Sequence, residues 1–576
     1  MLKLKKYVKY YLWQIAAVFI LLYFQAQADL ALPDYMSDII NNGIAVGDLD
    51  YILPAGLKML GVALIGTVCT VAVGFLAARI AAGISMRLRD DVFEKVESFS
   101  LTEFDHFGAS SLITRTTNDI QQVQMVVVMM LRFVFYAPIV GVGGVIRAVG
   151  KSGSMSWLIA VAVVMILTLI IVLFALAMPK FKMVQKLVDR LNRVTRESLV
   201  GMLVIRAFGN EAHEEQRFDD ANNDLTKTNL FVNRMITLMM PAMMLVMNLL
   251  TVAIVWVGSY FIDAGTLQIG DMMAFIQYAM QIIMAFLMVS MAFVMIPRAS
   301  VSAQRVFDVL ECEPAIKDPK TPQAPKADQT GVVEFKDVSF AYPGADENVI
   351  HNVSFTALPG QTTAFIGSTG SGKSTLINLI PRFYDVSQGQ ILVDGIDVRQ
   401  MSQHDLHQKI GLVPQKGILF TGSIADNLRF GDPEAEQDAL EEAAQIAQAT
   451  EFIDEKPERF ETEVSQGGTN VSGGQKQRLA IARALVKKPE IYIFDDSFSA
   501  LDFKTDAALR RALKPKTKNS TVLIVAQRIS TIMHAEQIVV MDDGEVAGIG
   551  THQELMENCE VYREIAQSQL SKEELA

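Results

Sequence analysis

A glycine-rich loop in the second half of the chain has the residue types and spacing of a phosphate-binding site. Residues 367–375 match the pattern G-x-x-x-x-G-K-[ST], directly after the apolar run 363–366 and before a helix expected over 374–381. Glycines let backbone N–H groups surround phosphate oxygens, and the start of a helix adds partial positive charge. The residues expected at the nucleotide are Gly367, Ser368, Thr369, Gly370, Ser371, Gly372, Lys373, Ser374 and Thr375.

Two adjacent acids follow a second apolar run. The run 491–494 ends in Asp495 and Asp496 and predicts a buried strand that carries carboxylates at its carboxyl end. Carboxylate and hydroxyl oxygens suit Mg²⁺, so Asp495 and Ser374 are the predicted ligands of a magnesium ion that accompanies ATP.

A third motif gives the resemblance to a known family. Residues 470–475 (NVSGGQ), followed by KQRLAIARAL, resemble the signature of ABC transporters, and the second half of the chain is similar to an ABC nucleotide-binding domain. The resemblance implies that Tyr342 stacks on adenine and that Gln415 contacts Mg²⁺. It also implies that a loop ending at Asp502 links the two sites of a dimer. The residues implied to cap ATP on the opposite subunit are Ser472, Gly473, Gly474 and Gln475.

Two positions depart from the pattern of an active ABC ATPase. Asp496 stands where the family carries the glutamate that orients or deprotonates water, and Gln527 stands where it carries a histidine that contacts the γ-phosphate. Aspartate is one methylene shorter, and a misplacement of about 1 Å can cost about a hundredfold in rate. Glutamine carries no positive charge into the transition state. We therefore expect a site that binds ATP and hydrolyses it slowly, as in one subunit of bacterial heterodimeric exporters.

The first half of the chain predicts a membrane domain. Six apolar runs are long enough to cross a bilayer, near 13–33, 53–81, 124–147, 156–178, 238–263 and 271–296. The predicted fold class is an α-helical membrane domain with six transmembrane helices and long cytoplasmic extensions, followed by an α/β P-loop nucleotide-binding domain. The predicted divisions are 1–310 for the membrane domain, 311–330 for a linker with four prolines, and 331–576 for the ABC domain.

Charge between the spans predicts the orientation. Segment 34–52 holds four aspartates and no lysine or arginine, whereas segment 179–237 holds ten basic residues. Basic loops stay in the cytoplasm, so both termini are expected there, in a multi-pass protein of the bacterial cell membrane. The spacing of apolar residues in segments 84–98 and 183–200 predicts helices that extend from the membrane into the cytoplasm. The ends of these extensions, near 101–109 and 203–213, are expected to dock on a cytoplasmic domain. The net charge of −12 argues against nucleic acid as a partner.

The cargo is less defined than the ATP site. The last two spans are rich in methionine, which favours an adaptable apolar cavity; the alternative is that these side chains face lipid. The predicted cavity residues are Gln277, Gln281, Met284 and Met288. Arg132 is the only charged residue well inside a predicted span, and Asp29 lies near a span end. Because no acidic residue lies in the middle of a span, the sequence gives no indication of a cationic cargo.

Three functions remain open. The first is export of hydrophobic or amphiphilic compounds, of the multidrug type, by a heterodimer. Its partner is a second half-transporter that supplies glutamate and histidine and carries an altered signature. The second is a lipid or lipopeptide flippase of the same architecture. The third is a regulatory or channel-like ABC protein gated by nucleotide.

Overall fold

The chain folds into two units. The structure is a computed structural model that describes residues 2–323 and 330–569. One unit comprises Met1–Glu97 and Ala109–Cys312, and the other comprises Ser98–Gly108 and Glu313–Ala576. The predicted linker falls mostly in the second unit, and its residues 324–329 lie outside the described part of the chain.

Among the residues that the structure describes, the first unit consists of six long helical stretches. Each is long and apolar enough to span a membrane: Lys5–Ile44, Leu49–Glu97, Ala109–Lys151, Gly153–Val200, Glu211–Asp263 and Ile269–Glu311. Their main helices are α1 (Lys5–Val8), α2 (Leu12–Asp38), α3 (Leu49–Glu97), α5 (Ala109–Thr114), α6 (Ile120–Met129), α7 (Tyr136–Lys151), α8 (Ser156–Val200), α10 (Glu211–Asp263) and α11 (Ile269–Glu311). All six predicted spans fall within these stretches. A helix of 49 residues such as α3 is about 74 Å long, well beyond the apolar thickness of a bilayer, so the expected helical extensions are present.

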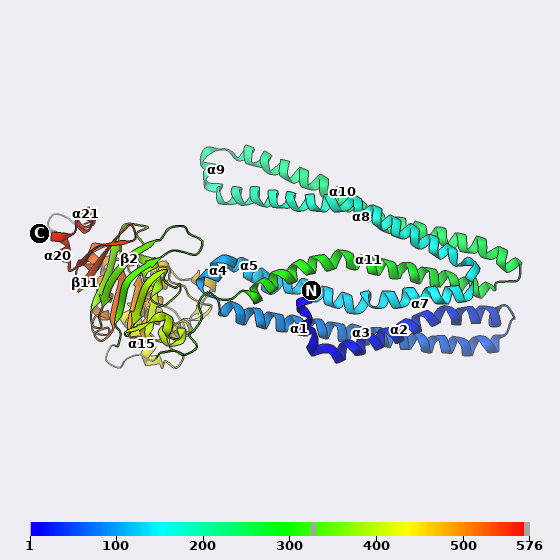
Figure 1. Ribbon diagram of the computed structural model, residues 1–576, viewed down its shortest axis with the longest axis horizontal. Helices are drawn as coiled ribbons and strands as arrows, with labels where there is room; N and C mark the ends of the chain where they lie inside the picture. The colour runs from blue at the N-terminus through cyan, green and yellow to red at the C-terminus, as the bar shows by residue number, and fades with distance from the viewer. Residues whose placement is uncertain (1, 324–329, 570–576) are drawn as a thin grey trace. The chain divides into compact units, whose positions relative to one another are not determined.

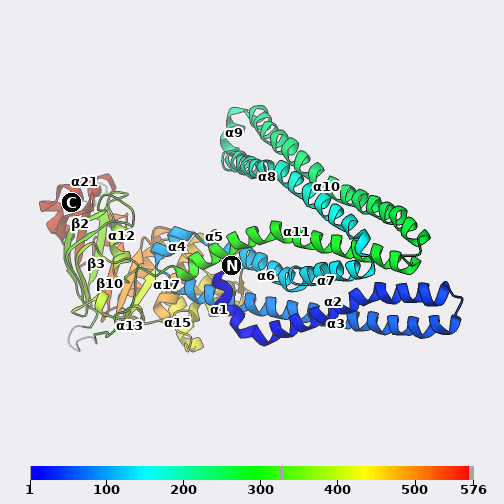
Figure 2. The ribbon, with the colours of Figure 1, turned by 45° about the vertical axis from the view of Figure 1, so that its right-hand side comes forward.

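The helices of this unit pack in pairs. The most extensive contacts join α2 with α3, α7 with α11, and α8 with α10. The pair α8–α10 diverges from the other helices toward the short helix α9 (Met202–Phe208) that connects it (Figures 1 and 2). Three apolar side chains of α9 are strongly exposed, namely Leu203, Val204 and Phe208. This tip therefore presents an apolar surface of the kind that marks a protein contact.

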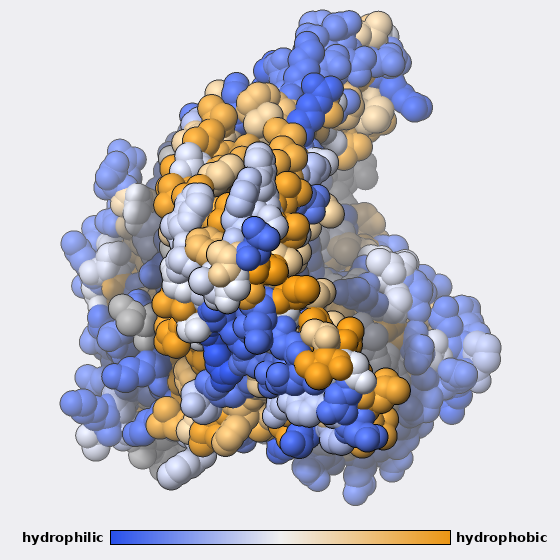
Figure 3. All heavy atoms as spheres, turned by 90° about the vertical axis from the view of Figure 1, so that its right-hand side faces the viewer, coloured by the Kyte–Doolittle hydropathy of each residue, from blue (hydrophilic) through white to orange (hydrophobic). Residues whose placement is uncertain are grey.

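Ion pairs hold three helices together at the opposite end of the unit. Arg147 pairs with Asp34, and Lys151 pairs with Asp34 at 3.5 Å and with Asp271 at 2.9 Å. Ser37 also donates to Asp271 at 2.7 Å, so α2, α7 and α11 share one polar network. Viewed from this end, hydrophilic residues form a patch flanked by hydrophobic ones (Figure 3).

The described residues of the second unit form two main sheets and a small two-stranded one. The six-stranded sheet has the order β12-β11-β3-β10-β9-β6, and the four-stranded sheet has the order β2-β1-β4-β5. The strands are β1 (Val333–Phe340), β2 (Ile350–Ala357), β3 (Thr362–Gly367), β4 (Gln388–Val393), β5 (Ile396–Asp397), β6 (Ile410–Val413), β7 (Gly422–Ser423), β8 (Glu463–Val464), β9 (Ile491–Asp495), β10 (Thr521–Val525), β11 (Gln537–Asp542) and β12 (Glu545–Gly550).

The six-stranded sheet is covered on both faces, as the apolar runs predict. All five residues of β9 are buried, and alternate side chains enter two different cores. Ile491 and Ile493 belong to one core, whereas Tyr492 and Phe494 belong to the other. Parallel strands that are buried on both faces have continuous apolar sequences. Residues 491–494 could be predicted to form a strand for this reason.

Helices of the second unit connect and cover these strands. The helices are α4 (Leu101–Phe107), α12 (Lys373–Leu379), α13 (Gln403–Lys409), α14 (Ile424–Arg429), α15 (Gln437–Ile446), α16 (Thr450–Asp454), α17 (Gly473–Val486), α18 (Phe503–Leu513), α19 (Ile529–Ile532), α20 (His552–Asn558) and α21 (Glu560–Gln569). Helix α12 begins one residue before the predicted 374 and ends two before 381.

Helix α4, the first of the two predicted docking tips, belongs to the second unit. Tyr384 donates a hydrogen bond to Asp105 at 3.3 Å, and burial raises the pKa of Tyr384 to about 12, so its hydroxyl keeps its proton at neutral pH. Glu103 accepts from the backbone N–H of Ala315 at 3.0 Å. The carboxylates of Glu103 and Asp105 thus fix helix α4 to the rest of the second unit.

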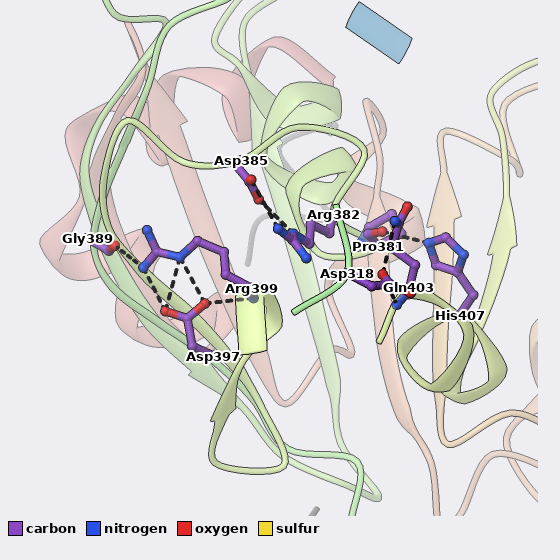
Figure 4. A network of polar contacts seen from close by, with 9 residues as sticks. All are labelled: Asp318, Pro381, Arg382, Asp385, Gly389, Asp397, Arg399, Gln403 and His407. Atoms are coloured by element: carbon purple, nitrogen blue, oxygen red, sulfur yellow. Dashed lines mark hydrogen bonds and ion pairs between the residues drawn. The ribbon is translucent and has the colours of Figure 1, made fainter. Parts of the chain in front are cut away.

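The described part of the linker is also tied to this unit. Asp318 accepts hydrogen bonds from the backbone and the side-chain amide of Gln403, at 3.0 and 3.1 Å (Figure 4). The backbone N–H of Gln323 donates to the carbonyl of Gln400 at 3.0 Å. These contacts give the proline-containing segment a defined path along the start of α13.

Candidate nucleotide-binding site

Four adjacent strands of the six-stranded sheet bring the predicted site together. In the order β3-β10-β9-β6, the strands are parallel, so their carboxyl ends lie at one edge. The phosphate loop follows β3, Gln527 follows β10, Asp495 and Asp496 end β9, and Gln415 follows β6. Ligands of open α/β sheets bind at this edge.

The phosphate loop has the backbone that its glycines predict. Gly370 and Gly372 adopt φ of +90° and +88°, which few other residues tolerate, and Gly372 precedes the first turn of α12. The Lys373 ammonium lies inside the loop, where it donates to the carbonyls of Gly367 at 3.0 Å and Ser368 at 2.6 Å. Burial lowers the pKa of Lys373, although both neighbouring aspartates oppose this shift. An anion entering the loop therefore meets a desolvated positive charge.

Ser374 and Asp495 form the pair expected at a magnesium ion. The Ser374 hydroxyl donates to Asp495 Oδ1 at 2.9 Å. Burial raises the pKa of the Asp495 carboxyl, and the nearby charge of Asp496 raises it further. Within the described residues no cluster of three or more His, Cys, Asp or Glu side chains could hold a metal ion. A carboxylate and a hydroxyl fit Mg²⁺, which completes its shell with phosphate and water.

The two substituted positions touch each other. Gln527 Nε2 donates to Asp496 Oδ2 at 2.8 Å, and Gln415 Nε2 approaches the same oxygen at 3.4 Å. Asp496 is mostly buried and has a φ of +46°, in the left-handed region, and burial raises the pKa of its carboxyl. Asp496 Oδ2 is thus held by the amides of two glutamines. Both substitutions were identified from the sequence, but the sequence does not show that the side chains of Asp496 and Gln527 contact each other.

Tyr342 lies beside the phosphate-loop helix. Its hydroxyl is 2.9 Å from Thr375 Oγ1, and its ring meets Phe340 and Tyr384 edge to face, with centroids at 5.0 and 5.3 Å. Its side chain remains partly exposed. The ring is held next to the loop by three neighbours and keeps a face that an adenine could cover.

The signature residues start a helix of 14 residues, α17. Ser472 Oγ accepts from the backbone of Gln475 at 3.3 Å, and Gln475 Oε1 accepts from the backbone of Ser472 at 3.0 Å. A Cβ on Gly473 would meet no atom within 4 Å. Within the described residues no hydrogen bond joins 472–475 to the phosphate loop. The open amides at the start of α17 could donate hydrogen bonds to a phosphate group.

Asp502 has a structural function that the sequence did not indicate. It caps α18, accepting from the backbone of Thr505 at 2.9 Å and from its hydroxyl at 2.7 Å. The backbone N–H of Thr505 lowers the pKa of the Asp502 carboxyl, which is therefore a charged helix cap at neutral pH. Its predicted placement in a loop between two ATP sites stays a prediction.

Gln569 is a residue of the site that sequence analysis missed. From the end of α21, its amide nitrogen donates to the carbonyl of Gln527 at 2.8 Å, and its amide oxygen accepts from the backbone of Ile529 at 2.9 Å. It thereby clamps the loop that carries Gln527. Gln569 lies 42 residues after Gln527 on the surface of a helix, and nothing in the sequence around it indicates that it contacts this loop.

Replacing Gln569 with leucine should loosen that loop. Two lost hydrogen bonds of about 1 kcal/mol each predict roughly thirtyfold faster opening of 526–532. Hydrogen exchange of the peptide covering these residues, in the purified complex, measures this directly. Gln567→Leu alters an exposed glutamine of the same helix and should leave the exchange unchanged. Equal exchange in both variants would show that the clamp contributes nothing.

The predicted cavity residues all lie on α11. Gln281 Nε2 donates to the backbone carbonyl of Asp29 at 3.1 Å, so this glutamine faces α2 and not lipid. Gln277 and Met288 are partly buried, whereas Met284 is exposed. The structure brings only Gln281 into a polar contact.

Comparisons with known proteins agree with this architecture. The sequence family described as ABC transporter transmembrane region matches residues 15–286, and the family described as ABC transporter matches residues 350–499. An uncharacterized ABC transporter ATP-binding protein of Mycobacterium tuberculosis is 41% identical over 98% of this chain and 97% of its own length. A fatty acid ABC transporter ATP-binding/permease protein of Mycobacterium bovis is 34% identical over 84% of this chain and 76% of its own.

Two further similarities concern export. A Bacillus subtilis ATP-binding/permease protein, provisionally named for multidrug export, is 32% identical over 85% of this chain and 84% of its own. The structure of a bacterial Atm1-family ABC exporter with ATP bound superposes with a TM-score of 0.80, covering 98% of this chain and 99% of that one at 24% identity. The fold is therefore that of an exporter half-transporter.

The chain belongs to the ABC transporter family. It joins one ABC transmembrane region to one ATP-binding domain and is an ABC-type transport ATPase of a membrane. The predicted family and fold class are confirmed.

Proposed function

We propose that this chain is one subunit of a heterodimeric exporter of hydrophobic or amphiphilic compounds. Its own nucleotide site binds ATP with Mg²⁺ and hydrolyses it slowly, and its signature completes the hydrolytic site of the partner. The observation that carries this proposal is the contact of Asp496 with Gln527 at 2.8 Å, beside an intact phosphate loop and an intact Ser374–Asp495 pair.

Binding and hydrolysis need different groups at this edge of the sheet. Lys373 and the loop amides receive phosphates, while Ser374, Asp495 and Gln415 are the groups that would hold Mg²⁺, which offsets phosphate charge when bound. Hydrolysis also needs a carboxylate at the attacking water and a cationic or donor group at the γ-phosphate. Here the carboxylate at position 496 is one methylene short and is hydrogen-bonded to the amide that replaces histidine.

Two surfaces support a second subunit. The apolar residues of α9 are exposed, with Leu203 at 85% and Phe208 at 81% of their maximal area. The open start of α17 places bare amides where a phosphate from another chain can approach. A second half-transporter with intact glutamate and histidine would cover both surfaces and supply the phosphate. Basic segments between the spans support cytoplasmic termini and a cell-membrane location.

The class of cargo is supported by the membrane unit and by relatives. Relatives carry names that refer to fatty acids and to multidrug export. A lipid or lipopeptide flippase of the same architecture is the second candidate, because the fatty acid relative handles a lipid. A nucleotide-gated regulatory protein is the third.

The test is to compare the purified chain alone with the complex that it forms with its partner half-transporter. We expect slow ATP turnover for the chain alone and turnover stimulated by amphiphiles for the complex. Rapid turnover by the chain alone would contradict the division of labour between subunits. Transport of fluorescent dyes but not labelled phospholipids separates the exporter from the flippase, and turnover that no amphiphile stimulates indicates the regulatory protein.

A further inference from the structure

An acidic side chain of α2 lies among the helices of the membrane unit and forms no ion pair with any of the residues that the structure describes. Asp29 is five residues, about 7.5 Å along the helix, from Asp34 in the terminal polar network. It is partly buried, and Tyr136 of α7 donates its hydroxyl proton to Asp29 Oδ2. Asp29 therefore faces another helix inside the unit, although the sequence placed it only near a span end.

The second carboxylate oxygen faces a glycine. A Cβ on Gly66 of α3 would lie 3.4 Å from Asp29 Oδ1, so this oxygen lies next to a residue that has no side chain to donate a hydrogen bond. Among the described residues no side chain or backbone N–H donates to Asp29 Oδ1, and none forms an ion pair with Asp29. The carboxylate thus keeps an open hydrogen-bonding position.

A second acceptor lies close by on α11. Gln281 Nε2 donates to the backbone carbonyl of Asp29 at 3.1 Å, which fixes the amide next to this residue. Its oxygen, Gln281 Oε1, is buried and has no hydrogen-bond partner among the described residues. A buried acceptor without a donor costs about 1–3 kcal/mol unless a ligand or water supplies one.

The nearby basic side chains are engaged elsewhere. Arg147 and Lys151 pair with Asp34 and Asp271. The Arg132 guanidinium lies against Gly74 and over the ring of Phe133, and Gly74 is about 12 Å along α3 from Gly66. The site at Asp29 consequently combines a negative charge with two oxygens that lack donors.

We propose that Asp29 and Gln281 bind the charged amine of a cationic amphiphile, with Tyr136 holding the carboxylate in place. A protonated amine supplies both the positive charge and the N–H donors that these oxygens lack, and a charged residue inside a membrane domain is costly unless it is paired. This inference rests on the proposed export function and narrows its substrates to compounds with an ammonium group.

The test uses two probes with the same apolar chain. Dodecylamine is positively charged at neutral pH, whereas dodecanol is neutral. Each is titrated into the complex of this chain with its partner, in nanodiscs, while ATP turnover is measured. We expect half-maximal stimulation at a concentration about tenfold lower for the amine than for the alcohol, as charge-assisted hydrogen bonds predict.

Asp29→Asn should remove this preference and leave the response to dodecanol unchanged, which also shows that the variant is folded. Asp29→Glu keeps the charge and should restore most of the preference. Asp38→Asn, the same change on the same helix, should behave as the wild type.

If Asp29→Asn keeps the preference for the amine, the proposed binding site at Asp29 is wrong. A wild-type complex that responds equally to both probes would overturn it too and leave the export function standing. A complex that responds to neither would contradict the export function itself.

Discussion

Replacing Asp496 with glutamate and Gln527 with histidine together should raise ATP hydrolysis at this chain's own site by about tenfold or more. Glutamate restores the reach of the carboxylate, and histidine restores a group that can carry positive charge to the γ-phosphate. The measurement is steady-state turnover of the complex, with the partner's catalytic glutamate replaced by glutamine so that this site dominates.

The two single variants provide the control for this experiment. Asp496 Oδ2 and Gln527 Nε2 are only 2.8 Å apart, so either change alone disturbs the existing contact. The gain from the double variant should therefore exceed the product of the single effects, as expected for side chains in contact. If the double variant binds ATP but hydrolyses it no faster, the slow hydrolysis lies in the partner's signature and not in these residues.

A carboxylate at Gly473 should nearly abolish turnover of the complex, although Gly473 lies outside the site of its own chain. Gly473→Asp places a negative charge at the start of α17, where the partner's phosphate is proposed to bind. Loss of such a donor site costs about a hundredfold in rate. The change should not harm the fold, because a Cβ there meets no atom within 4 Å and an acid suits the first turn of a helix.

The matched variant for this prediction is Asp496→Asn in the same chain. If the chain's own site contributes little hydrolysis, as proposed, this change should alter turnover of the complex by less than about twofold, well under the hundredfold loss expected where a site does the catalysis. The reverse pattern, with Gly473→Asp active and Asp496→Asn inactive, would place catalysis in this chain and refute the proposed asymmetry.

Much of the site could be predicted because each of its motifs is determined by residues that are adjacent in the sequence. The glycines of 367–375 and the apolar run before Asp495 encode a loop and a buried strand directly, and parallel strands deliver their ends to one edge. The contact of Asp496 with Gln527 could not be predicted, since it depends on β10 lying between β3 and β9. The clamp by Gln569 depends in the same way on where α21 packs.

The membrane unit was predictable in a coarser sense. Apolar length defined the spans, but composition does not say which face of a helix meets another. The sequence therefore indicates only that Asp29 lies near the end of a span. Its contacts with Tyr136 and Gln281 show that it lies between helices. Gln281 was identified because an amide is costly toward lipid, and its partner was not.

We propose that this chain retains ATP while its partner hydrolyses it. The most direct measurement supplies labelled ATP and Mg²⁺ to the complex, removes free nucleotide rapidly, crosslinks the bound nucleotide to each chain and identifies it. We expect intact ATP on this chain and ADP on the partner. ADP on this chain, formed as fast as on the partner, would contradict it.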